Sequence, residues 1–216
     1  MKILADNQEV QSKVRSVLRS SYTNAVSENR SPNIQEFAKT IIPYLDAVIE
    51  ELFRTSGTTP LIARTAEVDV EVLGKHIPKG TDVIFMTGGP SLKYPAFNIP
   101  ESLRSPSALG AKHVVPPWDP KDIGSFKPER WLVEGANGEK VFDASAGPML
   151  GFGLGPRGCF GRRLAYLEFK LVIVLILWNF ELLECPESMS TYAAVDRVTR
   201  QPQKCYAKLK KLTLLG

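Results

Sequence analysis

The chain has 216 residues, of which 44% are hydrophobic and 23% charged, so its composition is that of an ordinary globular protein rather than a disordered one. It is long enough to bury a substantial core as a single domain. The 27 Lys and Arg residues against 23 Asp and Glu give a formal net charge of +4, which argues against a nucleic-acid partner but leaves room for a local basic patch that binds an acidic protein. The longest apolar run, residues 171–178, is far shorter than the roughly 20 residues of a membrane span, so we expect no span in this chain.

The cysteines do not form a disulfide or zinc pattern. Cys159, Cys185 and Cys205 are odd in number and include no Cys-x-x-Cys pair. The two histidines, His76 and His113, lie far from every cysteine in the sequence. We therefore expect a reducing, intracellular compartment.

Three helices are predicted in the first quarter of the chain. Asp6 followed by Glu9 resembles a capping box, and apolar residues at helical spacing follow, so the first helix begins within a few residues of Met1. A Ser-Pro pair predicts a second, short helix over residues 31–43, with Ser as cap and Pro at the first helical position. A third helix is predicted over residues 44–55.

The rest of the chain predicts short strands and one long helix. Residues 67–72 alternate strictly between polar and apolar, as in a half-buried strand, and a second strand is predicted over residues 83–86. Residues 87–160 are rich in Gly and Pro and predict irregular structure, which is unusual at this length unless it is functional. From Phe180 onward the pattern predicts strand-like pieces around turns.

The long helix runs from just after Gly161 to about Trp178. It is predicted to bury one apolar face, which consists of Leu164, Leu167, Leu171, Val174 and Leu175. The predicted fold class is therefore mainly α with small β pieces.

Glu51 and Arg54 are three residues apart and meet on one face of the third helix. A surface ion pair is the usual interpretation of this spacing. However, the helix is apolar nearly all round, with only Asp46 and Glu50 forming a narrow polar strip, and this predicts a buried helix. A buried pair is costly unless other groups complete its hydrogen bonds, so a third partner is expected. Arg130 is a candidate that spacing alone does not single out.

Residues 152–161 form a glycine-rich loop around Cys159. Its four glycines allow positive φ angles and a close approach to a flat ligand. Cys159 lies just before the helix that begins near Gly161, where backbone N–H groups and the positive helix end would stabilise a thiolate. Arg157 and the Arg162-Arg163 pair add positive charge. The loop thus predicts an activated sulfur that binds metal or acts as a nucleophile.

Three other kinds of site have a cysteine or a glycine-rich loop of this sort. A buried structural cysteine is the commonest case for an arbitrary cysteine, but the flanking glycines and arginines disfavour it here. A Cys–His nucleophile would need His76 or His113, and neither has a recognisable motif around it. A phosphate-binding loop would end in Gly-Lys-Ser/Thr after a strand, and this loop does not.

Three segments together resemble motifs of the cytochrome P450 family. Residues 152–161 fill every fixed position of the signature Phe-x-x-Gly-x-Arg-x-Cys-x-Gly, residues 51–54 match Glu-x-x-Arg, and residues 126–131 match Phe-x-Pro-Glu-Arg-aromatic. The resemblance covers almost the whole chain. It implies that residues 1–216 are the C-terminal, haem-ligating portion of a single P450 domain, an incomplete fold from which the N-terminal half or more is absent. The residues of these segments are similar to those of fungal members of the family.

The resemblance implies that the cofactor is haem b, iron protoporphyrin IX. Cys159 would be its axial ligand, and a thiolate ligand donates electron density that favours O–O cleavage. Arg64 and Arg157 would pair with the haem propionates. Phe152 would pack near the sulfur side of the macrocycle and tune the iron through its surroundings.

Five further residues acquire expected roles in the same way. Gly161 and Ala165 would keep the helix after the cysteine close to the haem ring. Glu51, Arg54 and Arg130 would be structural, holding the core around the haem.

The function implied is a haem-thiolate monooxygenase that inserts one oxygen atom of O₂ into a small organic substrate, in fungal secondary-metabolite biosynthesis. An NADPH-dependent reductase would supply electrons by docking on the basic cluster near Cys159. Family members sit on the cytoplasmic face of the endoplasmic reticulum, but the anchor is absent here, as is the helix whose acid–alcohol pair delivers protons. One alternative is a truncated, non-catalytic haem-binding remnant, and another is a protein-interaction module without haem.

Overall fold

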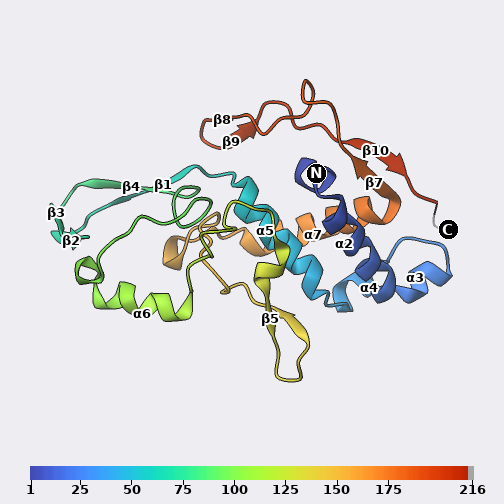
Figure 1. Cartoon of the computed structure of the whole chain (residues 1–216), viewed down its shortest axis with the longest axis horizontal. Helices are drawn as coiled ribbons and strands as arrows, with labels where there is room; N and C mark the ends of the chain where they lie inside the picture. The colour runs from blue at the N-terminus through green and yellow to red at the C-terminus, as the bar shows by residue number, and fades with distance from the viewer. Residues whose placement is uncertain (214–216) are drawn as a thin grey trace.

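The computed structural model describes residues 1–213, except for the side chains of Lys112 and His113. Over this range the chain combines helices with ten short strands, which pair as five two-stranded antiparallel sheets (Figure 1). The P450 fold class expected from the motifs is compatible with this mixture. The finer prediction, mainly α with small β pieces, is not clearly confirmed by this mixture.

The molecule is elongated and has two contrasting ends (Figure 1). One end carries β1 (Leu61–Thr65), β2 (Val70–Val72), β3 (Lys75–Ile77), β4 (Asp82–Met86) and α6 (Pro106–Val114). The other end carries α3 (Thr23–Ser27), α4 (Ile34–Lys39) and the C-terminal strand β10 (Lys208–Lys211). The remaining elements are α1 (Lys2–Asp6), η1 (Glu101–Leu103), η2 (Pro128–Trp131), β5 (Leu132–Glu134), β6 (Lys140–Phe142), η3 (Gly155–Arg157), β7 (Phe180–Leu183), β8 (Ala194–Asp196) and β9 (Arg200–Pro202).

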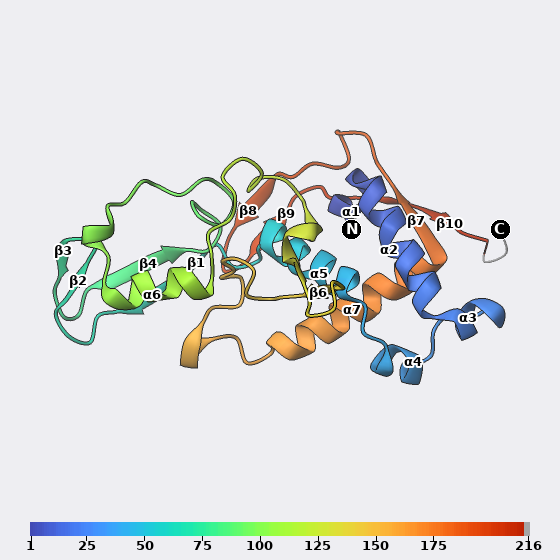
Figure 2. The same ribbon diagram turned by 60° about the horizontal axis from the view of Figure 1, so that its bottom comes forward.

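Three helices form the core. α2 (Gln8–Ser21), α5 (Pro43–Ser56) and α7 (Arg162–Asn179) contact one another and lie side by side in Figure 2. Their buried apolar side chains make one cluster, with Leu18 of α2, Ile49 of α5 and Leu177 of α7 all at 0–1% exposure. The three helices therefore share one apolar core. α7 begins in the middle of the molecule (Figure 2).

A buried glutamine joins the helical core to β7. The Leu182 N–H donates to Gln11 Oε1 at 2.7 Å, and Gln11 Nε2 donates to the carbonyl oxygens of Leu182 and Leu4 at 3.0 and 3.2 Å. The side-chain amide thus pairs with a strand as a backbone peptide would, and both of its polar ends are satisfied although the residue is fully buried.

The first helix begins within a few residues of Met1, as predicted, but two of the predicted helix caps were wrong. Asp6 ends α1 instead of capping α2, and its carboxylate pairs with Lys2 at 2.9 Å. The capping box of this region lies later, where Glu36 N donates to Asn33 Oδ1 at 3.0 Å and Asn33 N donates to Glu36 Oε2 at 2.8 Å. The second helix consequently begins at Ile34, because a complete reciprocal cap outweighs the Ser-Pro signal before it.

The third and long helices match the prediction in extent, but the buried face of α7 does not. Leu164, Leu167, Leu171 and Leu175 are 58%, 54%, 37% and 39% exposed, and only Val174 of the predicted stripe is buried. The buried side chains of α7 are Ile173, Val174, Leu177 and Trp178. This helix is apolar on most sides, so its periodicity does not select the face that α2 and α5 cover.

The strand and loop predictions need correction as well. Of the predicted strand over residues 67–72, only β2 forms, and it is exposed throughout rather than half-buried. β1 was not predicted, although it pairs with β4 in register Arg64↔Val83. α6 lies inside the stretch expected to be irregular, and its start follows the ordinary rule, since the Ala108 N–H donates to Ser105 Oγ at 3.2 Å. Within residues 1–213, no helix has both the length and the apolarity to cross a bilayer.

Candidate functional site

A buried ion pair lies at the centre of the core. Arg54 Nη2 and Nε are each 2.7 Å from a Glu51 oxygen, and the two residues are 4% and 0% exposed. Arg130 Nε is 3.1 Å from Glu51 Oε1. The Trp131 indole and the Lys127 backbone N–H each donate to Glu51 at 2.9 Å. The carboxylate therefore has partners from α5 and from the segment around η2, as a buried charge requires.

The guanidinium of Arg54 also binds the main chain. Its N–H groups donate to the carbonyl oxygens of Leu92, Ile123 and Ser125 at 2.6, 2.9 and 3.0 Å. These carbonyls fix the course of the irregular stretch between β4 and η2. Sequence reasoning missed them, because a carbonyl acceptor has no residue-type signal.

Two side chains complete this network without having been predicted. Asp122 accepts from Arg130 Nη1 at 3.0 Å, and the Lys127 ammonium together with Arg130 holds the pKa of Asp122 below its usual range. The Trp118 ring lies 5.2 Å from the Arg130 guanidinium and 5.9 Å from that of Arg54. Trp118 thus covers the ion pair from one side.

The cysteine loop is closed by backbone hydrogen bonds. The Cys159 N–H donates to the Phe152 carbonyl at 2.7 Å, and the Arg162 N–H donates to the Cys159 carbonyl at 3.3 Å. Gly153 and Gly155 have φ angles of 67° and 66°, which only glycine adopts readily. Cys159 is exposed at the start of α7, so its sulfur is not sealed inside packed side chains.

The other two glycines of the loop, Gly158 and Gly161, do not have the positive φ angles that the sequence predicted. A Cβ atom at Gly158 would approach the Gly155 carbonyl oxygen to 3.2 Å, so this glycine allows the tight turn. A Cβ atom at Gly161 would meet only the Cys159 sulfur, at 4.0 Å. Glycine at 161 is therefore not required by the chain's own packing and leaves space beside the sulfur.

Aromatic contacts hold the loop against the core. The Phe152 ring is 5.0 Å from Phe53 of α5 and 5.4 Å from Tyr166 of α7, measured between centroids. The first residue of the loop is thus clamped between the two helices that carry the core. The loop before α7 extends toward the end of the molecule that holds β1 and α6 (Figure 2).

The two arginines predicted to face a ligand are both exposed. Arg157 ends η3, two residues before Cys159. Arg64 lies in β1 and donates to the Ala63 carbonyl at 2.7 Å. It shares a face of the strand with Ile62, whose Cδ1 lies 3.8 Å from the Cβ position of Gly153. Arg64 is therefore on the side of β1 that meets the cysteine loop.

Ala165 lies in the first turn of α7, where its N–H donates to the Gly161 carbonyl at 2.9 Å. Gly161 and Ala165 therefore lie one helical turn apart, directly after the cysteine loop. Both are partly exposed.

The placement of Glu50 on a polar strip was wrong. Its side chain is fully buried between α5 and α7, where it accepts a hydrogen bond from the Tyr166 hydroxyl. Arg162 Nη2 lies 3.7 Å from Glu50 Oε1. Burial raises the pKa of Glu50, and the Tyr166 hydrogen bond and the Arg162 charge oppose that rise. Asp46, by contrast, is partly exposed and pairs with Lys170 at 2.7 Å.

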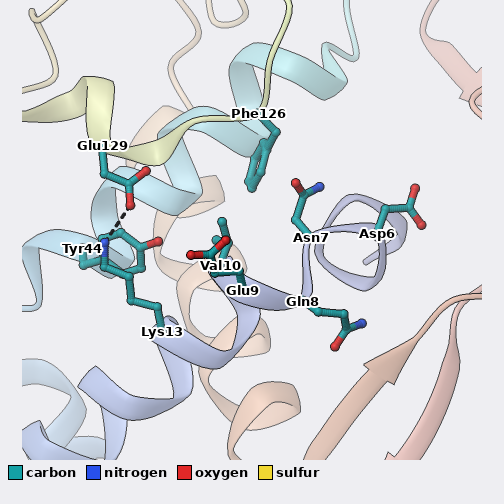
Figure 3. Close-up of a pocket in the computed structure, with 9 residues that line it drawn as sticks. All are labelled: Asp6, Asn7, Gln8, Glu9, Val10, Lys13, Tyr44, Phe126 and Glu129. Atoms are coloured by element: carbon teal, nitrogen blue, oxygen red, sulfur yellow. Dashed lines mark hydrogen bonds and ion pairs between the residues drawn. The ribbon is translucent and has the colours of Figure 1, made fainter.

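A polar pocket of about 520 Å³ lies at the opposite end of α5 from the cysteine loop. It is lined by residues of α1, α2 and the start of α5, together with Phe126 and Glu129 (Figure 3). The Lys13 ammonium occupies part of it, 2.7 Å from Glu129 and 4.1 Å from the centre of the Tyr44 ring. This pocket is separate from the cysteine loop.

The structure thus brings together an exposed cysteine at a helix start, a clamped loop and a buried network that supports both. Comparison with known proteins identifies the family of the chain. The family model for cytochrome P450 matches residues 1–104 and 121–208. The chain belongs to the cytochrome P450 family.

Fungal monooxygenases are among its similar relatives. It is 48% identical to cytochrome P450 monooxygenase TRI13 of Fusarium sporotrichioides, over 99% of this chain and 38% of that protein. It is 39% identical to the Hps1-dma1 cluster cytochrome P450 monooxygenase cyp3.1 of Dothistroma septosporum, over 99% of this chain and 71% of that protein. The chain thus spans well under half the length of the first relative and about 70% of the second.

The family implies a haem cofactor, and the residues present fit one. A haem iron takes a single cysteine sulfur, and Cys159 is exposed. A Cβ atom at Gly161 would fill the space beside that sulfur. Exposed apolar side chains suited to a macrocycle lie close in sequence, with Leu154 and Leu164 at 64% and 58% exposure.

Proposed function

We propose that residues 1–216 are the haem-ligating portion of a single P450 domain, in a monooxygenase that inserts one oxygen atom of O₂ into a small organic substrate. The observation that carries this proposal is the exposed Cys159 on a loop clamped between α5 and α7. Membership of the cytochrome P450 family supports it. Fungal monooxygenases among the relatives, one named for a biosynthetic cluster, support a role in secondary metabolism.

Each residue of the site has a role in this proposal. Cys159 holds the iron of haem b through its sulfur, and the haem, when bound, supplies the chemistry of O₂ activation. Arg64 and Arg157 bind the propionates, because planar guanidinium groups pair well with carboxylates. Phe152 packs near the sulfur side of the macrocycle and tunes the iron through its surroundings.

The remaining residues keep these groups in place. Gly161 and Ala165 let the start of α7 lie close to the flat ligand. Glu51, Arg54 and Arg130 are structural and fix α5 relative to the loops that precede the cysteine. The exposed Arg157 and Arg163 offer a basic surface to an NADPH-dependent reductase. The proposed location is intracellular.

Haem reconstitution tests this function. The chain should bind haem weakly and give a carbon-monoxide difference band at the thiolate position, and Cys159→Ser should abolish that band. Cys205→Ser is the matched control, since Cys205 is also exposed, and it should leave the band unchanged. A thiolate band that persists in Cys159→Ser would contradict the proposal. Haem binding without any substrate oxidation would favour the non-catalytic remnant.

A further inference from the structure

Glu50 is a buried carboxyl that lacks a full set of partners. It is 0% exposed, and its Oε2 accepts the Tyr166 hydroxyl. Its Oε1 has no hydrogen-bond partner among the described residues, and Arg162 Nη2 lies 3.7 Å away. A buried, half-satisfied acid destabilises a fold, so its place between α5 and α7 calls for a physical explanation.

Arg162 connects this carboxyl to both sides of the cysteine loop. Its backbone N–H donates to the Cys159 carbonyl at 3.3 Å. Its guanidinium lies 5.8 Å from the centre of the Phe152 ring, and the Phe152 carbonyl accepts the Cys159 N–H at 2.7 Å. The guanidinium is also 5.4 Å from the Tyr166 ring. The Arg162 side chain, which is 42% exposed, therefore contacts Glu50 and the two rings at the same time.

We infer that Glu50 is a positioning residue for Cys159, which acts by orienting Arg162 and Tyr166 at the first turn of α7. The hydroxyl of Tyr166 anchors one carboxyl oxygen, and the Arg162 guanidinium approaches the other. The geometry of the loop therefore depends on a carboxyl that touches neither the cysteine nor its ligand. The contacts of Arg162 with the cysteine loop do not depend on the proposed function, whereas a role of Glu50 in haem ligation rests on it.

A second ion pair between the same helices provides an internal control. Asp46 of α5 and Lys170 of α7 are 2.7 Å apart, with side chains 25% and 19% exposed. They lie one helical turn from Glu50 and Tyr166, farther from the start of α7, and no described contact links them to residues 152–161. If Glu50 only held α5 against α7, neutralising Asp46 should have the same consequence for the loop.

Amide hydrogen exchange in the full chain tests this inference. The exchange rate of a peptide covering residues 152–162 is measured in wild type, Glu50→Gln and Asp46→Asn, each corrected for its own global stability. Glu50→Gln should speed loop exchange about tenfold, the effect of one lost charge-assisted contact, and Asp46→Asn should leave it unchanged. Equal loop exchange in the two variants would overturn the inference. If Glu50→Gln does not fold, Tyr166→Phe removes one anchor and should raise loop exchange in the same direction, and an unchanged rate there would overturn it equally.

A double variant tests whether Glu50 acts through Arg162. In an Arg162→Met background, adding Glu50→Gln should change loop exchange less than it does in the wild type, because only the Tyr166 contact remains, and a full additional effect would contradict the proposed route. After haem addition, Glu50→Gln should also lower the fraction of protein with a thiolate-type carbon-monoxide band. If the wild-type chain binds no haem, the proposed function fails, but the exchange comparison still decides the role of Glu50.

Discussion

Two adjacent glutamates of α5 show how the partners of a buried acid determine its role. Glu51 accepts hydrogen bonds from Arg54, Arg130, Trp131 and the Lys127 backbone, so its charge is fully compensated. Glu50, one residue earlier, has one hydrogen bond, to Tyr166, and one cation, Arg162, 3.7 Å from its other oxygen. We therefore expect Glu51 to contribute to stability and Glu50 chiefly to geometry.

Loss of Glu51 should be strongly destabilising. Glu51→Ala leaves the buried Arg54 guanidinium without its carboxylate and leaves Arg130 with Asp122 alone, and breaking a buried pair costs about 3–5 kcal/mol. The control is Glu129→Ala, because Glu129 pairs with Lys13 at 2.7 Å in an exposed bridge worth about 0–1 kcal/mol. Urea unfolding of both variants measures the difference. Similar losses in the two variants would contradict the structural role of Glu51.

A methyl group at Gly161 should harm ligand binding more than folding. Gly161 has φ −78°, which alanine adopts without strain, and the new Cβ would contact only the Cys159 sulfur. Gly161→Ala should change the free energy of unfolding by no more than about 0.5 kcal/mol. Its haem dissociation constant should rise roughly tenfold, since the methyl group would occupy space that the ligand needs and overpacking costs about 1–3 kcal/mol.

The control for this variant is Gly110→Ala in α6. A Cβ atom there has nothing within 4 Å, so haem affinity should stay at the wild-type value. Haem titration of the two variants makes the comparison. Unchanged affinity in Gly161→Ala would argue against a ligand lying beside the sulfur at this position.

At the scale of elements, α4 depends on an ionised cap. The Arg30 guanidinium and the Asn33 backbone N–H lower the pKa of Glu36 from 4.5 to about 2. As the pH falls, the Glu36 carboxylate is protonated at a higher pH in the unfolded chain than in the folded one. The contribution of the cap to the free energy of unfolding is therefore complete above about pH 4.5 and is lost as the pH falls through about 2. α4 should therefore loosen at acid pH before the apolar core does.

Glu36→Gln tests this dependence. The stability difference between wild type and Glu36→Gln should be constant near neutral pH and should shrink as the pH is lowered from about 5 to about 3. Chemical unfolding at several pH values gives the curve. Glu168→Gln, which alters an exposed carboxyl on α7, should show no such trend, and a pH-independent difference for Glu36→Gln would refute the assignment.

At the scale of the whole molecule, α7 leaves an apolar surface open. Leu164, Leu167 and Leu171 are 58%, 54% and 37% exposed along one side of the helix. Contiguous exposed apolar patches promote association and dye binding, whereas scattered apolar residues do not. We expect the 216-residue chain to bind a hydrophobic dye and to self-associate as its concentration rises.

Replacing these three leucines with glutamine should lower both dye fluorescence and self-association. The matched control replaces three exposed apolar residues on separate strands, Val133, Val195 and Leu209, which are 37%, 37% and 53% exposed. Dye fluorescence and sedimentation measure the outcome. If both triple variants behave alike, the α7 surface has no special role in association.

The extent of α5 and α7 and the residues of the motifs were predictable from local patterns. Helix spacing predicted the third helix over 44–55, and the structure has α5 at Pro43–Ser56. The Glu-x-x-Arg and Phe-x-Pro-Glu-Arg motifs pointed to Glu51, Arg54 and Arg130. In the structure, Arg54 and Arg130 both form ion pairs with Glu51. The burial of Glu50 and the exposed side of α7 were not predictable, because α5 and α7 are apolar on most of their surfaces.

By itself, the sequence determined where helices α5 and α7 run, which cysteine precedes a helix start, and which family the chain belongs to, because these depend on neighbours within a few residues. The tertiary structure alone decided which side of α7 is buried, which acid of α5 is left with an unpaired oxygen, and which carbonyls complete the bonds of Arg54. Those carbonyls lie 38, 69 and 71 residues from Arg54 along the chain. Contacts of this kind form only when distant segments pack together, and no local spacing of residue types encodes them.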